Sequence, residues 1–229
     1  MEQVIRMHGS FGKNKVIERL SFQSKMLEYN TQISIPNNAE VVVIKDGEIE
    51  RINKIDNFVI NSHRTGFFNH DKFDPSDYVV YFVYKARIGG AWGGNVQFRD
   101  NSLNEIHGTL FIRVSYYYHI ENGAALIQKL QDIIPYYSEE YLKKLIHPSL
   151  SNLIQQKVSS VINEVGLDEL QNHLFDLSNH LLENINNAIF GQLGLHMDSL
   201  EIVCDEEELH RKKRSSYEWN KIVKENKED

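Results

Sequence analysis

The sequence predicts an α+β protein, in which an antiparallel-rich β-sheet from the N-terminal half packs against helices from the C-terminal half. Three observations support this class. Apolar runs flank Asp46-Gly47, the signal of a β-hairpin with a tight turn. Residues 109–120 alternate between apolar and polar side chains, as a strand with one buried face does. After Gly123 the apolar residues recur at helical spacing instead.

The start of the chain is expected to form a short helix, and the hairpin follows it. Scattered apolar residues in 1–30, among them Val16 and Ile17, predict a helical or mobile N-terminal segment. The two strands of the hairpin are expected at 40–45 and 48–52.

Further strands are expected in the middle of the chain. A polar loop at 61–77 precedes the run 78–84, whose β-branched and aromatic residues predict a central strand. The glycine cluster at 88–94 is interpreted as the lead-in to a strand at 95–100, with glycines marking bulges or close backbone approach. The alternating strand comes next, with apolar positions at Leu110, Ile112, Val114, Tyr116, Tyr118 and Ile120.

The second half is expected to be helical up to a last strand. Ser138, followed by two acidic residues, predicts a helix N-cap, and Pro148 is expected to divide the following stretch into two helices. Asp168 is expected to cap a further helix and Gly194 to end it. A short strand is expected at 195–203.

An apolar stripe marks the helix after Asp168, and it has two interpretations. The helix packs on the sheet of its own chain, or the stripe is a coiled-coil seam between subunits. The first is preferred because the heptad register is short and Asn184 falls in it. The stripe consists of Leu167, Leu170, Leu174, Leu177 and Leu181, widened by Phe175, Leu182, Ile185 and Ile189.

Composition excludes some classes of function. The chain has 229 residues, 41% of them hydrophobic, which is enough for a real core. Its formal net charge of -7 argues against nucleic-acid binding, because neutralising phosphates needs a basic face. The single cysteine, Cys204, cannot form an internal disulfide, which fits a reducing compartment.

The apolar runs of the sequence are too short to span a membrane. The runs at 41–44 and 78–84 fall far below the roughly 20 residues of a transmembrane helix. Glu2 and Arg6 interrupt the region where a secretory signal would be apolar, so the expected location is the cytoplasm. Peripheral contact with the inner face of the cell membrane, through the first thirty residues, stays open as an alternative.

The candidate chemical groups favour the absence of catalysis. His63, His70, Asp71, Asp74 and Asp77 are metal-ligand types, but their spacing matches no known site and predicts a solvated loop. The glycine cluster lacks the lysine of a phosphate-binding loop. The acidic residues after Cys204 disfavour a thiolate, so a structural or surface cysteine is expected. We therefore expect no catalytic residue, no cofactor and no metal.

Four stretches, in this order and spacing, resemble a known superfamily. They are the strands around the Asp-Gly turn at 31–52, the glycine-containing hairpin at 89–122, the helix and strand at 159–203, and the charged helix from 205 to 224. The chain resembles the SPFH or band 7 (stomatin, prohibitin, flotillin and HflK/C) superfamily, particularly its soluble, virion-core-protein-like bacterial branch. The positions that match are Gly108, Arg113, Ser115 and Tyr116, and then Leu193, Gly194, Leu195, Met197, Leu200 and Ile202.

The resemblance implies an SPFH-like domain at 31–204, an N-terminal segment at 1–30 and a charged helix or tail at 205–229. It implies assembly into homo-oligomers and the organisation of protein complexes near membranes, without catalysis. Two features depart from the pattern. The chain shows no apolar anchor at its start, and no cysteine follows Cys204, where many relatives carry a zinc ribbon.

The function expected from the sequence is thus a non-enzymatic oligomeric scaffold. Two alternatives stay open: a monomeric ligand- or protein-binding module with the same fold, and a metal-dependent hydrolase using the loop at 61–77. Assembly is expected to use the C-terminal helix, whose basic cluster could also contact anionic lipids. The expected partner or assembly contacts are Trp92, Leu209, Arg211, Lys212, Lys213, Arg214, Tyr217 and Trp219.

Overall fold

The chain consists of strands and helices in two compact units, which confirms the α+β class. The range 31–204, expected to be one domain, is distributed over both units. Unit 1 comprises Met1–Arg87, His119–Lys144 and Gly191–His196, and unit 2 comprises Ile88–Tyr118, Leu145–Phe190 and Met197–Asp229. The computed structural model describes residues 4–6, 14–19, 32–35, 38–45, 47–52, 58–59, 78–100, 106–130, 136–205, 207, 209–212, 214, 215 and 218.

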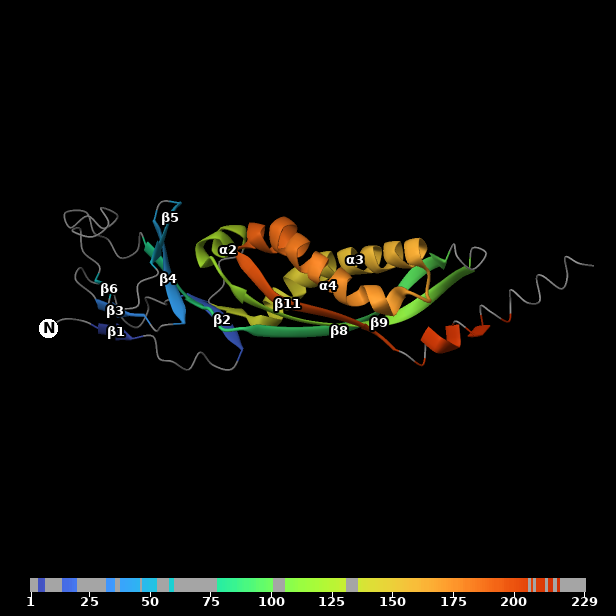
Figure 1. Ribbon diagram of the computed structural model, residues 1–229. Helices are drawn as coiled ribbons and strands as arrows, with labels where there is room; N and C mark the ends of the chain where they lie inside the picture. The colour runs from blue at the N-terminus through green and yellow to red at the C-terminus, as the bar shows by residue number, and fades with distance from the viewer. Residues whose placement is uncertain are drawn as a thin grey trace, which may run out of the picture. The chain divides into compact units, whose positions relative to one another are not determined.

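Unit 1 is built on a five-stranded antiparallel sheet in the order β10-β2-β7-β4-β5 (Figure 1). β7 lies between β2 and β4, which confirms the predicted central strand. The strands are β2 (Lys15–Arg19), β4 (Ala39–Lys45), β5 (Glu48–Ile52), β7 (Tyr78–Tyr84) and β10 (Tyr136–Ser138). A smaller sheet joins β1 (Val4–Arg6), β3 (Gln32–Ser34) and β6 (Phe58–Val59), and helix α2 (Gly123–Lys129) contacts β4 and β5.

The predicted hairpin is confirmed. β4 and β5 pair antiparallel, from Val41 opposite Ile52 to Lys45 opposite Glu48. Gly47 in the turn has a φ of +83°, in the left-handed region that glycine enters without a steric penalty.

The predicted N-terminal helix is wrong for Val16 and Ile17, which lie in β2 and are buried. β2 pairs with β7 on one side and β10 on the other, so ladder hydrogen bonds and burial outweigh a weak local preference for helix. Val4–Arg6 is also a strand, and the remainder of 1–30 apart from 14–19 lies outside the described residues.

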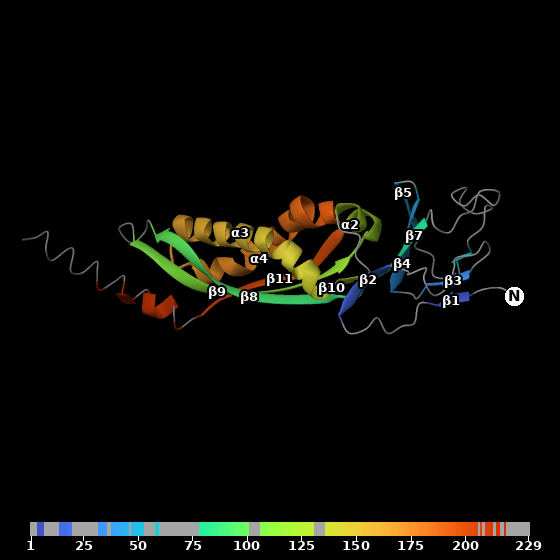
Figure 2. The ribbon, with the colours of Figure 1, turned by 180° about the vertical axis from the view of Figure 1, so that it is seen from behind.

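Unit 2 is a sheet with helices over one of its faces. Strands β8 (Ile88–Asp100), β9 (Ile106–Ile120) and β11 (Leu195–Cys204) lie in the order β11-β9-β8. Helices α3 (Glu139–Val165) and α4 (Leu170–Ile185) lie over the same face of this sheet in both views (Figures 1 and 2). The core of the unit therefore lies between the helices and that face.

The hairpin of β8 and β9 combines a confirmed prediction with a corrected one. The residues predicted to face inward on β9, from Leu110 to Ile120, are buried. The glycine cluster does not lead into a strand, because it lies within β8 and pairs with β9 throughout. A Cβ atom at Gly90 would overlap the ring of Tyr116, and one at Gly93 would overlap that of Phe111, so close approach is the reason for glycine there.

Helix α3 begins as predicted but does not break at Pro148. The N–H of Tyr141 donates to Oγ of Ser138 at 3.1 Å, which makes Ser138 the predicted cap. The division at Pro148 is wrong, since one helix runs through it. Pro148 lies on the exposed side, and the buried row on the other side stabilises the helix by more than the roughly 3 kcal/mol that a proline costs. That row consists of Ile146, Leu150, Ile154, Val158 and Ile162.

Helix α4 begins one residue later than a cap at Asp168 would place it, so that cap is a wrong prediction. The N-cap position is Glu169, whose side chain makes no capping hydrogen bond. Leu167 and Leu170 are both fully buried, so burial rather than capping determines where the helix starts.

The stripe of α4 is buried within the chain, which confirms packing in the protein's own core. Leu170, Leu174, Leu181 and Ile185 are buried, with Ser178 among them, whereas Leu177 is only half-buried. Phe175 does not widen the stripe, because it is 74% exposed. The helix continues as a π-helical turn, η4 (Asn186–Phe190), and a 3-10 turn, η5 (Gly191–Leu193), and ends at Gly194, as predicted, with a φ of +67°.

Candidate functional site

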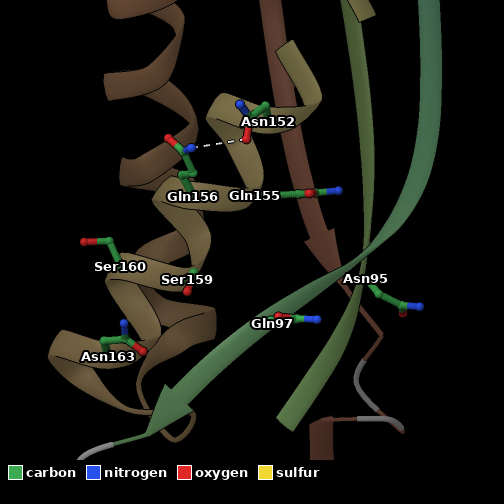
Figure 3. A pocket seen from close by; sticks show the side chains of 8 residues that line it. All are labelled: Asn95, Gln97, Asn152, Gln155, Gln156, Ser159, Ser160 and Asn163. Carbon is green, nitrogen blue, oxygen red and sulfur yellow. Dashed lines mark hydrogen bonds between the residues drawn. The ribbon is translucent and has the colours of Figure 1, made fainter. Parts of the chain in front are cut away.

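A polar groove lies between α3 and β8 in unit 2 (Figure 3). Its volume is about 480 Å³, within the range of about 300–1,000 Å³ typical of ligand pockets. Two lining residues come from the strand and six from the helix. They are Asn95 and Gln97 on β8, and Asn152, Gln155, Gln156, Ser159, Ser160 and Asn163 on α3.

The helical side of the groove follows from the periodicity of α3. Its groove residues recur three and four positions apart and so share one face, next to the buried row. Amide groups cluster there, and Nε2 of Gln156 donates to Oδ1 of Asn152 at 3.2 Å. The side chain of Gln155 points toward the strands (Figure 3), and its Nε2 lies 3.1 Å from where a Cβ of Gly94 would be.

The strand side of the groove is an edge of the sheet, because β8 is the last strand in the order β11-β9-β8. The N–H of Arg99 donates to Oδ1 of Asn163 at 2.9 Å, so the backbone of Arg99 points away from β9. Backbone groups alternate along an antiparallel strand, so those of Asn95 and Gln97 point the same way. Within the described part of the chain these outward groups have no strand partner.

The groove contains hydrogen-bonding groups and no ionisable side chain. Its lining consists of amides and hydroxyls, each able to donate and to accept. Such groups position a neutral polar ligand, but they supply neither a general base nor a charge for electrostatic catalysis. Over the residues that the structure describes, no three His, Cys, Asp or Glu side chains gather as a metal site would require. The chemistry of the groove is that of binding.

Trp92, one of the predicted contacts, lies in the same unit as the groove but does not line it. Its ring packs edge-on against His147, with 5.7 Å between the centroids. Its Nε1 is buried and finds no hydrogen-bond partner in the described structure. The half-buried indole thus packs against His147, and its role as a partner contact stays a prediction.

The predicted contacts of the C-terminal helix differ in exposure. Asp205 caps the start of this helix, where its Oδ1 accepts from the N–H of Glu207 at 3.0 Å. Leu209 is buried, at 2% exposure, and so packs within its own chain. Arg211 and Arg214 are exposed and Lys212 is half-buried, whereas Lys213, Tyr217 and Trp219 lie outside the described residues. Their role as contacts stays a prediction.

Within the described residues, the remaining candidates supply no further site. Cys204 is a buried free cysteine, whose Sγ lies 3.7 Å from the backbone oxygen of Asp205. The loop with His63, His70, Asp71, Asp74 and Asp77 lies outside the described residues.

Comparison with known proteins assigns no family. No protein-family model matches the chain, and no curated protein matches its sequence. Among the helices that the structure describes, none has the length and hydropathy needed to cross a membrane.

Sequence reasoning missed the groove, although one signal was available. Between Asn152 and Asn163 the polar face of α3 carries amides and hydroxyls where a solvated helix usually carries charges, and only Lys157 is charged there. The other half of the groove comes from β8, which is far away in the sequence. Only the fold shows that the two segments meet.

Proposed function

We propose that the protein is a non-enzymatic, SPFH-type scaffold that self-associates in the cytoplasm. The observation that supports this most is the exposed face of the sheet in unit 2, opposite the helices. Tyr117 is 47% exposed there and Val203 is 43% exposed. Exposed apolar side chains grouped on one face are typical of protein-interaction surfaces.

Two glycines on β8 leave room for aromatic rings on this face. The ring of Tyr117 lies over Gly89, since a Cβ there would be 2.9 Å from the ring, and the ring of Phe111 lies over Gly93. Aromatic rings that cover strand glycines in this way also stabilise the sheet. A sheet face that presents aromatic rings is well suited to packing against another sheet.

Two charged side chains on the same face, Arg113 and Glu201, already have polar partners. Nη2 of Arg113 lies 3.6 Å from Oδ2 of Asp205, and Oγ of Ser115 donates to a carboxylate oxygen of Glu201 at 3.0 Å. Charges that already have partners lose less solvation when a second surface covers them. A second copy of the chain is the simplest occupant, because a two-fold axis brings the same face together with itself.

Light scattering on the full chain tests this proposal. We expect a mass above the 26.7 kDa of one chain. Tyr117→Lys and Val203→Lys should each lower that mass, while Phe175→Lys, on α4, should not. Thermal melts of all three variants check that they fold. A wild-type mass of 26.7 kDa at every concentration would contradict self-association, and equal effects of all three substitutions would place the contact elsewhere.

The neutral groove favours a second candidate function, a ligand- or protein-binding module. This function does not require assembly, since one chain supplies both sides of the groove.

A further inference from the structure

We infer that the groove between α3 and β8 binds an extended, uncharged peptide segment of a partner protein, which adds as a strand to the edge of β8. This inference does not rest on self-association, because it uses the edge of the sheet and not its exposed face.

The edge of β8 lacks the features that normally prevent strand addition. Natural edge strands are protected by lysines, prolines, bulges or very short length. β8 is 13 residues long, it has no charge and no proline between Ile88 and Phe98, and it pairs with β9 without a register shift. An outward backbone row runs from Ala91 to Gln97, about 20 Å at 3.4 Å per residue, which matches a segment of about seven residues.

Helix α3 turns this edge into a bounded site. The bond from the Arg99 N–H to Asn163 closes the far end of the edge, where the helix already takes the place of a partner strand. Upstream of that point, α3 lines the same groove with polar side chains, and the amide of Gln155 points toward the strands. A strand that docks here would therefore pair its backbone with β8 and its side chains with α3 (Figure 3).

The uncharged lining of the groove favours an uncharged ligand. A charged side chain entering the groove would lose solvation without meeting an opposite charge, whereas Asn, Gln, Ser, Thr and Gly would exchange hydrogen bonds with the amides. A neutral oligosaccharide shares this hydrogen-bonding chemistry. The peptide is favoured because outward backbone N–H and C=O groups on β8 alternate at the spacing of a strand.

The substitution Asn95→Pro separates these possibilities. The N–H of Asn95 points outward, so a proline there removes no hydrogen bond between β8 and β9 while it blocks an incoming strand. Asn95→Thr is the matched control, since it removes the same side-chain amide but keeps the N–H and suits a strand. Thermal melts show whether both variants are folded.

A phage-displayed library of random nine-residue peptides is selected for binding to the full chain. We expect enrichment of uncharged sequences, whose synthetic peptides bind the wild type and, with only the loss of one side-chain amide, still bind Asn95→Thr. Binding to Asn95→Pro should be about tenfold or more weaker than binding to Asn95→Thr, as the loss of one or two backbone hydrogen bonds implies. Methylation of alternate backbone nitrogens in the peptide should weaken its binding to the wild type by a similar factor. This test does not depend on the folding of any variant.

Several results would overturn the inference. They are a lack of enrichment, enrichment of charged peptides, and binding that Asn95→Pro and backbone methylation leave unchanged. Binding of neutral oligosaccharides on an array, with no peptide bound, would reassign the groove to sugars. Light scattering of Asn95→Pro adds a further check. If the substitution lowers the mass of the assembly, a second copy of the chain occupies the edge of β8. If the chains associate through the exposed face of the sheet instead, the mass should not change.

Discussion

The carboxylate of Glu40 lies 3.0 Å from the Nζ of Lys85, and the side chain of Glu40 is completely buried. The other carboxylate oxygen accepts a short hydrogen bond from the N–H of Gly123, the first residue of α2. Glu40 lies on β4 and Lys85 directly follows β7. One buried side chain thus connects the sheet of unit 1 to the helix that contacts it.

Removing the cation should destabilise unit 1 because Lys85 supplies a positive charge directly beside a buried carboxylate. We expect Lys85→Met to lower the free energy of unfolding by about 2–4 kcal/mol, somewhat below the 3–5 kcal/mol of a fully buried pair because Lys85 is partly exposed. Urea denaturation measures this change. The matched control is Lys144→Met, since Lys144 pairs with the exposed Glu140 at 2.9 Å and little change is expected. Equal losses would contradict a special role for the buried pair.

A methyl group at Gly90 should strain the core of unit 2. Gly90→Ala would drive its Cβ into the buried ring of Tyr116, and overpacking of this kind costs about 1–3 kcal/mol. Gly93→Ala meets the half-buried ring of Phe111, which has room to move, so a smaller loss is expected. Combining Gly90→Ala with Tyr116→Leu should recover part of the loss in a double-mutant cycle. Additive effects would show that the two residues do not collide.

Truncation of two adjacent residues on α4 should affect stability to very different extents. Leu174→Ala removes a side chain that is 5% exposed, and we expect a loss of about 2–5 kcal/mol and a lower melting temperature at every protein concentration. Phe175→Ala, at a 74% exposed position, should leave the melting temperature nearly unchanged. Melts over a hundredfold concentration range, paired with light scattering, measure both. A Leu174→Ala effect that appears only at low concentration would instead indicate an intersubunit seam.

Stability should fall in alkaline solution because of buried tyrosines. Burial raises the pKa of Tyr116, and burial also raises the pKa of Tyr81 although nearby Arg19 partly opposes it. Above the ordinary pKa of about 10 the unfolded chain releases these protons while the folded chain keeps them. The unfolded state then binds fewer protons, so the free energy of unfolding decreases as pH rises. Tyr116→Phe should flatten this decrease in urea titrations from about pH 9 to 11, and a slope parallel to the wild type would contradict the assignment.

The sequence alone determined the elements whose signals are local. The turn at Gly47 requires a conformation that favours glycine, Ser138 caps the helix that starts beside it, and β9 repeats its apolar residues every second position. Each of these features depends on neighbours within a few residues. The sequence pattern is therefore sufficient to predict them.

Tertiary structure decided the rest, because it depends on burial and on pairing between distant segments. Ile17 becomes a strand residue through β7 and β10, and Pro148 stays inside one helix because a buried row continues past it. The groove exists because α3 lies beside the edge of β8, and no pattern within either segment indicates the other. Local signals determine what a segment can form, whereas the free energy of burial, summed over the whole core, determines which segments meet.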